Sequence, residues 1–107
     1  EGRIPQAGLF VLDDQNLKPE QVEQFVVKFE EASLWINEHP AEAGPLVEKH
    51  FENMKAPAVQ ESLKYARLNP ARASACQQEV EEFFTELLET APPEALGGKL
   101  PDAQFYY

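Results

Sequence analysis

The residues that could do chemistry in this chain are few and far apart. His39 and His50 stand eleven positions apart, and neither has a cysteine or another histidine at the spacing of a metal site. The pattern HExxH is also absent. We therefore predict no metal site and expect surface or helix-capping positions for both histidines. His50 is expected in the last turn of a short helix, where the helix dipole favours a positive charge.

The sequence offers no clear nucleophile. Cys76 falls within the apolar pattern of a predicted helix and is expected to be a small core residue, because the sequence places no histidine beside it. Ser33, Ser62 and Ser74 lack the G-x-S-x-G frame of a hydrolase nucleophile. We therefore predict no catalytic residue and no enzymatic activity.

Clustered glutamates do not change that prediction. The cluster consists of Glu79, Glu81, Glu82, Glu86 and Glu89. These residues spread around a predicted helix instead of sharing one side, which is typical of a solvated face. A catalytic carboxylate pair needs a cleft and a cause for a shifted pKa, and the sequence indicates neither.

The C-terminal tail contains two further motifs. Residues 97–99 (GGK) lack both the G-x-x-x-x-G-K-[ST] frame and a following helix, so we expect a glycine turn with positive φ and no phosphate or cofactor site. Residues 105–107 (FYY) could be a stacking platform for a ligand. A terminal aromatic cluster more often fastens the chain end to a core by burying apolar area, and we expect that role here.

Composition indicates a folded acidic protein. The 107 residues are 43% hydrophobic and carry 19 acidic against 9 basic side chains, a net charge of -10. This length allows one domain with a modest core, and the apolar content excludes wholesale disorder. An acidic surface repels phosphate backbones, so we predict no nucleic-acid partner. The single cysteine excludes an intramolecular disulfide and leaves the compartment open.

Apolar periodicity and proline positions predict one strand and four helices. The segment from Ala7 to Leu12 (AGLFVL) is short, apolar and rich in residues that favour a buried strand. Helices are expected at about 19–38, 41–52, 57–67 and 71–90, followed by an irregular tail over 91–107. Pro45 fits the second helix only if it falls in the first turn, or if the helix starts later than Ala41. The predicted class is therefore mainly α with one short strand.

Both the strand and the first helix lack partners in this sequence. A single strand leaves its backbone N–H and C=O groups unpaired, so we expect 7–12 to pair with another copy or with a sheet outside the sequence. The first helix has one broad apolar face, formed by Val22, Phe25, Val26, Phe29, Ala32, Ser33 and Ile36. Val27 and Leu34 lie on a second side. We therefore expect an exposed apolar patch around 7–12 and around Val27 and Leu34 wherever these partners are missing.

Five stretches in a fixed order resemble a known family. They are residues 4–11 (IPQAGLFV), 19–25 (PEQVEQF), 31–43 (EASLWINEHPAEA), 96–102 (LGGKLPD) and 105–107 (FYY). Together they resemble the C-terminal portion of substrate-binding proteins of ABC importers, in the group that handles nitrate, sulfonates, taurine and thiamine precursors. The tail is the most specific of the five, whereas residues 54–75 match the family least clearly.

The resemblance implies a fold, a function and partners. The fold would be a two-lobe α/β fold of the type II periplasmic-binding-protein class, to whose first lobe this segment contributes a strand and the C-terminal helices. The whole protein would capture a sulfonate, nitrate, a pyrimidine precursor or a similar small molecule in the periplasm or outside the cell, lipid-anchored or free. Its partners would be that solute, a membrane permease and the remainder of its own chain. No ligand-contact residue of the family matches here, so the ligand-binding residues stay unknown.

A second interpretation stays open. The chain could be a free-standing acidic helical interaction module that forms a homo-oligomer through the lone strand at Ala7 to Leu12. The two apolar sides of the first helix favour this interpretation as much as they favour the receptor. The resembling family also includes a few proteins that synthesise a precursor, which leaves an enzyme as a third alternative without any residue here to support it.

Overall fold

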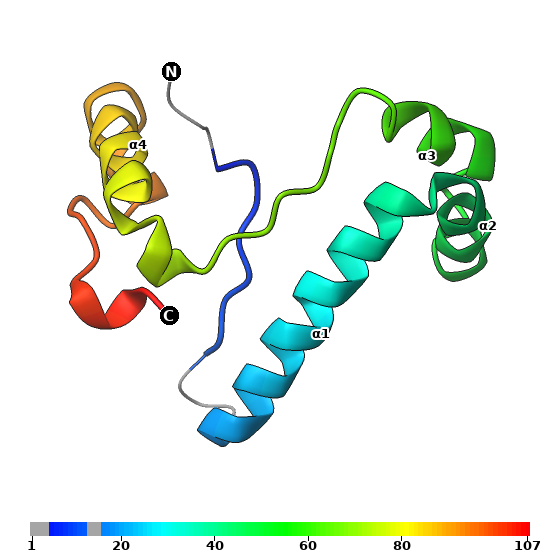
Figure 1. The fold of residues 1–107 in the computed structure, drawn as a ribbon. Helices are drawn as coiled ribbons and strands as arrows, with labels where there is room; N and C mark the ends of the chain where they lie inside the picture. The colour runs from blue at the N-terminus through cyan, green and yellow to red at the C-terminus, as the bar shows by residue number, and fades with distance from the viewer. Residues whose placement is uncertain (1–4, 13–15) are drawn as a thin grey trace. The chain divides into compact units, whose positions relative to one another are not determined.

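The computed structural model describes residues 5–12 and 16–107 as helices joined by irregular segments (Figure 1). In order, the α-helices are α1 (Pro19–Glu38), α2 (Pro40–His50), α3 (Ala56–Ser62) and α4 (Gln77–Thr90). Short 3-10 helices lie at η2 (Ala73–Ala75), η3 (Pro93–Ala95) and η4 (Ala103–Phe105). The described residues include no β-strand.

The prediction of a strand at 7–12, and with it an α/β lobe, is therefore wrong for this chain. A strand needs a neighbour that accepts and donates its backbone hydrogen bonds. The residues described here supply no such neighbour, and none of the recorded backbone bonds involves 7–12. The segment is irregular and exposed, and the secondary structure of the described residues is entirely helical.

The chain divides into two units. The α1–α3 unit comprises Val11–Pro70, and the α4 unit comprises Glu1–Phe10 together with Ala71–Tyr107. Each is built around few buried side chains. Among the described residues, the buried apolar side chains are Ala43 and Tyr106, and Ser33 is the buried polar one. Both units therefore have small cores, since most of the large apolar side chains remain at least partly exposed.

Helix α1 has the bounds predicted from the sequence. Pro19 is its first residue, where the missing N–H costs nothing, and the side chain of Gln21 accepts a hydrogen bond from the Lys18 backbone N–H at 2.9 Å. The helix ends before Pro40 because the residue preceding a proline avoids the helical region. His39 accordingly has φ -127° and ψ 51°.

The side-chain amide of Asn37, near the end of α1, binds the backbone of Leu68 in the irregular segment after α3. We call this contact the Asn37 clamp. Asn37 donates to the Leu68 carbonyl at 2.7 Å and accepts from the Leu68 N–H at 2.9 Å. The amide thus satisfies both the N–H and the C=O of Leu68, as a neighbouring strand would do. The chain after α3 is therefore fixed to α1 without forming secondary structure.

Helix α2 is shifted and shortened from the predicted 41–52, and it contains Pro45 beyond its first turn. Pro45 has no N–H for the carbonyl four residues earlier, that of Ala41. Gln60 of α3 supplies the missing donor, because its Nε2 lies 3.0 Å from the Ala41 oxygen. The proline is thus tolerated because a neighbouring helix satisfies the acceptor that it leaves.

Helix α3 is shorter than the predicted 57–67, since the residues from Leu63 onward form turns. Its N-terminus is capped from α2. A carboxylate oxygen of Glu48 accepts the Ala56 N–H at 2.8 Å, and its other oxygen lies 3.2 Å from the Lys55 ammonium. The described contacts make α2 and α3 a tight helical pair.

Helix α4 begins six residues later than the predicted 71–90. The stretch before it contains η2 and the cap residue Cys76, whose φ of -122° is not helical. Val80, Phe83, Phe84 and Leu87 then share the half-buried face of α4, as the apolar spacing predicts.

Candidate functional site

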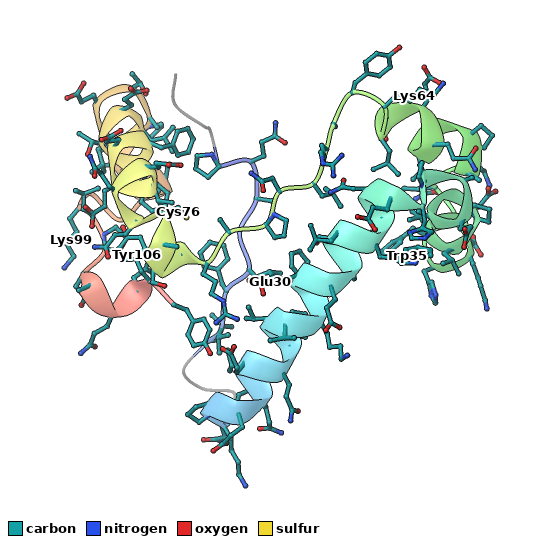
Figure 2. The ribbon with its side chains drawn as sticks, viewed as in Figure 1. Glu30, Trp35, Lys64, Cys76, Lys99 and Tyr106 are labelled. Atoms are coloured by element: carbon teal, nitrogen blue, oxygen red, sulfur yellow. The ribbon has the colours of Figure 1, made fainter. Side chains whose placement is uncertain are left out.

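The two histidines occupy helix ends. The ring of His39 stacks on that of Trp35 with centroids 4.8 Å apart, and its Nδ1 lies 2.9 Å from the Trp35 carbonyl oxygen. Figure 2 shows Trp35 near the C-terminal end of α1. His50 is the last residue of α2, in the position favourable to the dipole. In the described part of the chain, no group of three or more His, Cys, Asp or Glu is arranged to hold a metal.

Cys76 does not lie in the middle of an apolar helix face as predicted. It precedes α4, is half-buried, and its thiol donates to the Arg72 carbonyl oxygen at 3.3 Å. Ser33 and Ser62 donate their hydroxyls to carbonyls of their own helices, those of Phe29 and Val59. These hydroxyls therefore bond to nearby backbone carbonyls, and neither is shown bonded to a base.

The glutamates of α4 form no catalytic pair. Glu81 accepts a hydrogen bond from Gln77 at 2.8 Å, and Glu82 accepts one from Gln78 at 3.0 Å, both between residues four apart on one helix. Glu82, Glu86 and Glu89 are exposed. This arrangement matches the predicted solvated face.

The tail contains the predicted glycine turn. Gly97 and Gly98 have φ values of 65° and 75°, a region that other residues rarely adopt. A Cβ at either position would meet no atom within 4 Å, so backbone conformation and not crowding explains the glycines. Lys99 follows the turn on the surface (Figure 2).

An aromatic cluster fastens the tail within the α4 unit, as predicted. The Phe105 ring contacts those of Phe10 and Phe84 at centroid distances of 5.9 and 6.3 Å. It also meets Tyr106 edge-on at 5.2 Å. Tyr106 is only 8% exposed, and Figure 2 shows it near the start of α4. These contacts join the tail to α4 and to Phe10 within this unit.

The Tyr106 hydroxyl is the one buried side-chain polar atom, among those the structure describes, that has no hydrogen-bond partner. Burial raises the pKa of this phenol, and the nearby Glu81 carboxylate raises it further. Both effects keep the hydroxyl neutral. An unpaired neutral donor in this position costs stability and does no chemistry by itself.

Exposed apolar side chains are the most prominent feature of both units. Phe25 is 60% exposed and Phe29 is also exposed, although both belong to the face of α1 that the sequence predicted to be buried. Leu34 is 55% and Val27 36% exposed on the second side of α1. Leu9, Phe10, Val11 and Leu12 are exposed too, so the exposure expected at 7–12 and at Val27 and Leu34 is found in each region by itself.

This arrangement can bind other apolar surfaces. Large exposed apolar areas on soluble proteins typically mark interaction sites. None of the helices in the described residues is both long enough and apolar enough to span a membrane. The candidate site is therefore, in each unit taken by itself, the set of exposed apolar side chains just described.

Sequence reasoning missed the polar contacts that position α2, α3 and the end of α1. The Glu48 cap, the Asn37 clamp and the Gln60 donor each join residues from seven to 31 positions apart. Of these three contacts, only the one made by Gln60 could have been suspected from the sequence. Pro45 inside a helix leaves the Ala41 carbonyl without its usual N–H, so another donor is expected.

Comparison with known proteins adds no further relationship. The chain matches no protein-family model, no curated protein and no solved structure.

Proposed function

We propose that this chain is a non-catalytic helical part of the solute-binding component of an ABC importer. That component captures a small molecule, such as a sulfonate, nitrate or a pyrimidine precursor, and delivers it to a membrane permease from the periplasmic or outer side. The observation that carries the proposal is the exposure of large apolar side chains on both units. Covering such side chains with further protein removes apolar area from water and is favourable.

From the resemblance, we infer that the covering protein is the remainder of the receptor chain. Two structural details support a scaffold role for the residues that carry the resemblance. Within 31–43, α1 ends at His39 and Pro40 opens α2 directly, so this stretch forms the junction of two helices. Within the tail, the two glycines take positive φ and Tyr106 is buried. The residues that carry the resemblance therefore have definite structural roles, in keeping with a scaffold.

The proposed role of the chain within that receptor is support, not ligand contact. No group of described side chains forms a metal site, and His39 and Cys76 contact backbone carbonyl oxygens, whereas Glu81 and Glu82 accept hydrogen bonds from glutamines of their own helix.

Calorimetry tests the proposal. The protein as the cell produces it should bind one of the candidate solutes, and binding should raise its melting temperature because ligand stabilises only the folded state. The isolated 107 residues should bind none of them below millimolar concentration. Solute binding by the isolated chain, or a natural protein with a mass near the 12.1 kDa of this chain, would contradict the proposal.

A second candidate is a free-standing acidic module that self-associates through 7–12. The exposure of Leu9, Phe10, Val11 and Leu12 favours it specifically. This candidate requires that the protein as the cell produces it has a chain mass near 12.1 kDa. It also requires that the average mass of the particles in solution rises with protein concentration. The measurement of natural mass therefore separates the two candidates.

A further inference from the structure

Residues 64–69, which follow α3, are all exposed and lie outside the helices. Residues 66–72 have no secondary structure, as the chain after α3 in Figure 1 shows. Tyr65 is 83% exposed, and Figure 2 shows Lys64 at the end of α3. Proteases nick folded proteins preferentially in such segments, because the backbone is accessible there without the unfolding of a helix. Residues 64–69 therefore meet the first requirement of a cleavage site.

The same part of the chain is basic. Lys64, Arg67 and Arg72 are the only charged residues between Glu61 and Glu79, whereas the whole chain has a net charge of -10. A protease that cuts after a basic residue receives that side chain in a pocket that contains a carboxylate. The local positive charge therefore suits a protease of this specificity.

The peptide bonds that follow Lys64 and Arg72 are held by local structure. The Lys64 ammonium pairs with Glu61, and the N–H of the next residue donates to the Ser62 carbonyl at 3.1 Å. Arg72 is half-buried, and its carbonyl accepts the Ala75 N–H at 2.9 Å at the start of η2. Cleavage after either residue therefore requires a turn to open first.

The bond between Arg67 and Leu68 is held in a different way. Within the described residues, no ion pair or hydrogen bond of Arg67 is recorded, for its side chain or its backbone. Leu68 is held by the Asn37 clamp, in which the amide accepts the Leu68 N–H at 2.9 Å and donates to the Leu68 carbonyl at 2.7 Å. Cleavage must release the Leu68 nitrogen, so the clamp holds an atom that the reaction has to free.

The Asn37 clamp slows access to this bond without closing it permanently. Both hydrogen bonds of the clamp are exposed, so water competes for the same groups. Opening at Leu68 needs only the loss of these two bonds, and α1 and α3 can stay intact while it occurs.

We propose that the Arg67–Leu68 bond is a cleavage site for an endoprotease that cuts after arginine, and that the Asn37 clamp limits the rate of cutting. The reaction consumes one water molecule. Its oxygen joins the Arg67 carbonyl carbon, which becomes a carboxylate, and its two protons go to the Leu68 nitrogen, which becomes an ammonium. Helices α1, α2 and α3 stay on one product and α4 on the other, so one chain becomes two without a break in any helix. This inference does not rest on the proposed function, because it uses only residues 37 and 64–72.

Limited digestion of the intact 107-residue chain with a commercial arginine-specific endoprotease tests the site. Time-resolved mass spectrometry gives the rate of cleavage at each arginine. The comparison is between Arg67 and Arg72, because Arg3 lies outside the described residues. Cleavage after Arg67 should be at least about tenfold faster than cleavage after Arg72, since the turn at η2 must open for the second.

Substitution of Asn37 tests the clamp. N37A should speed cleavage after Arg67 by about three- to tenfold, because cleavage follows the fraction of molecules in which the clamp is open, and two exposed hydrogen bonds provide a factor of this order. The matched control N53A, at an exposed asparagine in the turn after α2, should leave the rate unchanged. Circular dichroism confirms that both variants keep their helix content.

A second digestion separates local opening from a general loss of stability. With a lysine-specific endoprotease, cleavage after Lys28 reports the unfolding of α1, and N37A should change that rate by less than about twofold. Cleavage after Arg72 that is as fast as cleavage after Arg67 would overturn the assignment of the site. An N37A rate equal to that of the wild type, or an increase at Arg67 matched by an equal increase at Lys28, would overturn the role of the clamp.

Discussion

Gly44 leaves no room for a side chain where α2 meets α3. A Cβ built on it would lie 2.8 Å from the Ala56 carbonyl oxygen and 2.9 Å from Cγ of Gln60, closer than real contacts allow. The Ala56 oxygen belongs to the backbone, so relieving the contact would require the two helices to separate. Gly44 is buried within α2, so glycine is needed there because it has no side chain and not for its backbone freedom.

We therefore predict that G44A destabilises the α1–α3 unit by about 1–3 kcal/mol from overpacking, reduced by up to about 1 kcal/mol because alanine favours helix. Urea denaturation followed by the fluorescence of Trp35, the only tryptophan, measures this unit. The control E42A changes an exposed position of α2 and should stay within about 0.5 kcal/mol of the wild type. A stabilised G44A protein would show that α2 and α3 do not pack as described.

The carboxylate of Glu48 connects the same two helices through charge. The hydrogen bond from the Ala56 N–H lowers the pKa of Glu48 below its ordinary value of 4.5, and the hydrogen bond from Lys55 lowers it further. Because the folded pKa is lowered, the contribution of this carboxylate is complete above the ordinary value. It is lost as the pH falls from there through the folded pKa.

We predict that the urea midpoint of the wild type falls more between pH 7 and pH 3 than that of E48Q, in which this group cannot titrate. At pH 7 the E48Q protein should be the less stable of the two, since a neutral amide is a weaker acceptor than a carboxylate. The exposed control E42Q should keep the pH dependence of the wild type. Equal pH dependence in E48Q and the wild type would mean that the cap is absent in solution.

At the scale of elements, α2 and α3 depend on one another through Pro45. The proline removes the donor for the Ala41 carbonyl, and Gln60 of α3 replaces it at 3.0 Å. In P45A the backbone N–H of residue 45 returns and can bond to Ala41 in the ordinary helical way. The Gln60 side chain should then contribute less to the free energy of unfolding, because the Ala41 carbonyl has another donor.

A double-mutant cycle tests this coupling. We expect Q60A to cost about 0.5–1.5 kcal/mol in the wild-type background, the usual net value of such a hydrogen bond. The cost should be smaller by at least about 0.5 kcal/mol in the P45A background. Urea denaturation of the four proteins, followed by Trp35 fluorescence, gives the coupling. Additive effects of the two substitutions would rule out the compensation that we infer.

The elements that could be predicted from the sequence are those specified by local signals. Pro19, the apolar period and the pair His39–Pro40 fix both ends of α1, and the glycine turn at 97–98 follows from residue type. The start of α4 could not be predicted in this way. Residues 71–76 include Ala71 and Ala73, which extend the helical pattern, whereas Cys76 takes a non-helical conformation that no local signal requires.

The strand prediction at 7–12 failed for a reason that is not local. β propensity describes a side chain that fits a half-buried sheet, and it has no effect until a second strand provides hydrogen bonds. Likewise, the apolar period of α1 predicted which residues share a face but could not show whether anything covers them. Phe25 belongs to the predicted core face and remains exposed.

At the scale of the whole molecule, the exposed apolar segment should make the chain associate with itself at high concentration. Leu9 and Leu12 are both more than half exposed, and association would remove them from water. Each buried leucine contributes roughly 1.5–3 kcal/mol when it is fully covered. Repulsion between chains of net charge -10 opposes association, so it should increase with added salt.

We predict that sedimentation of the wild-type chain shows an average mass that rises above 12.1 kDa with concentration, and more strongly at high salt. The substitutions L9S/L12S should weaken association by at least about tenfold, since partial burial of two leucines exceeds 1.4 kcal/mol. Y65S removes another exposed apolar side chain and should not change association. Phe10 is left intact in this comparison because it contacts Phe105 within the α4 unit. A wild-type chain that stays monomeric at every concentration and salt level would contradict this prediction.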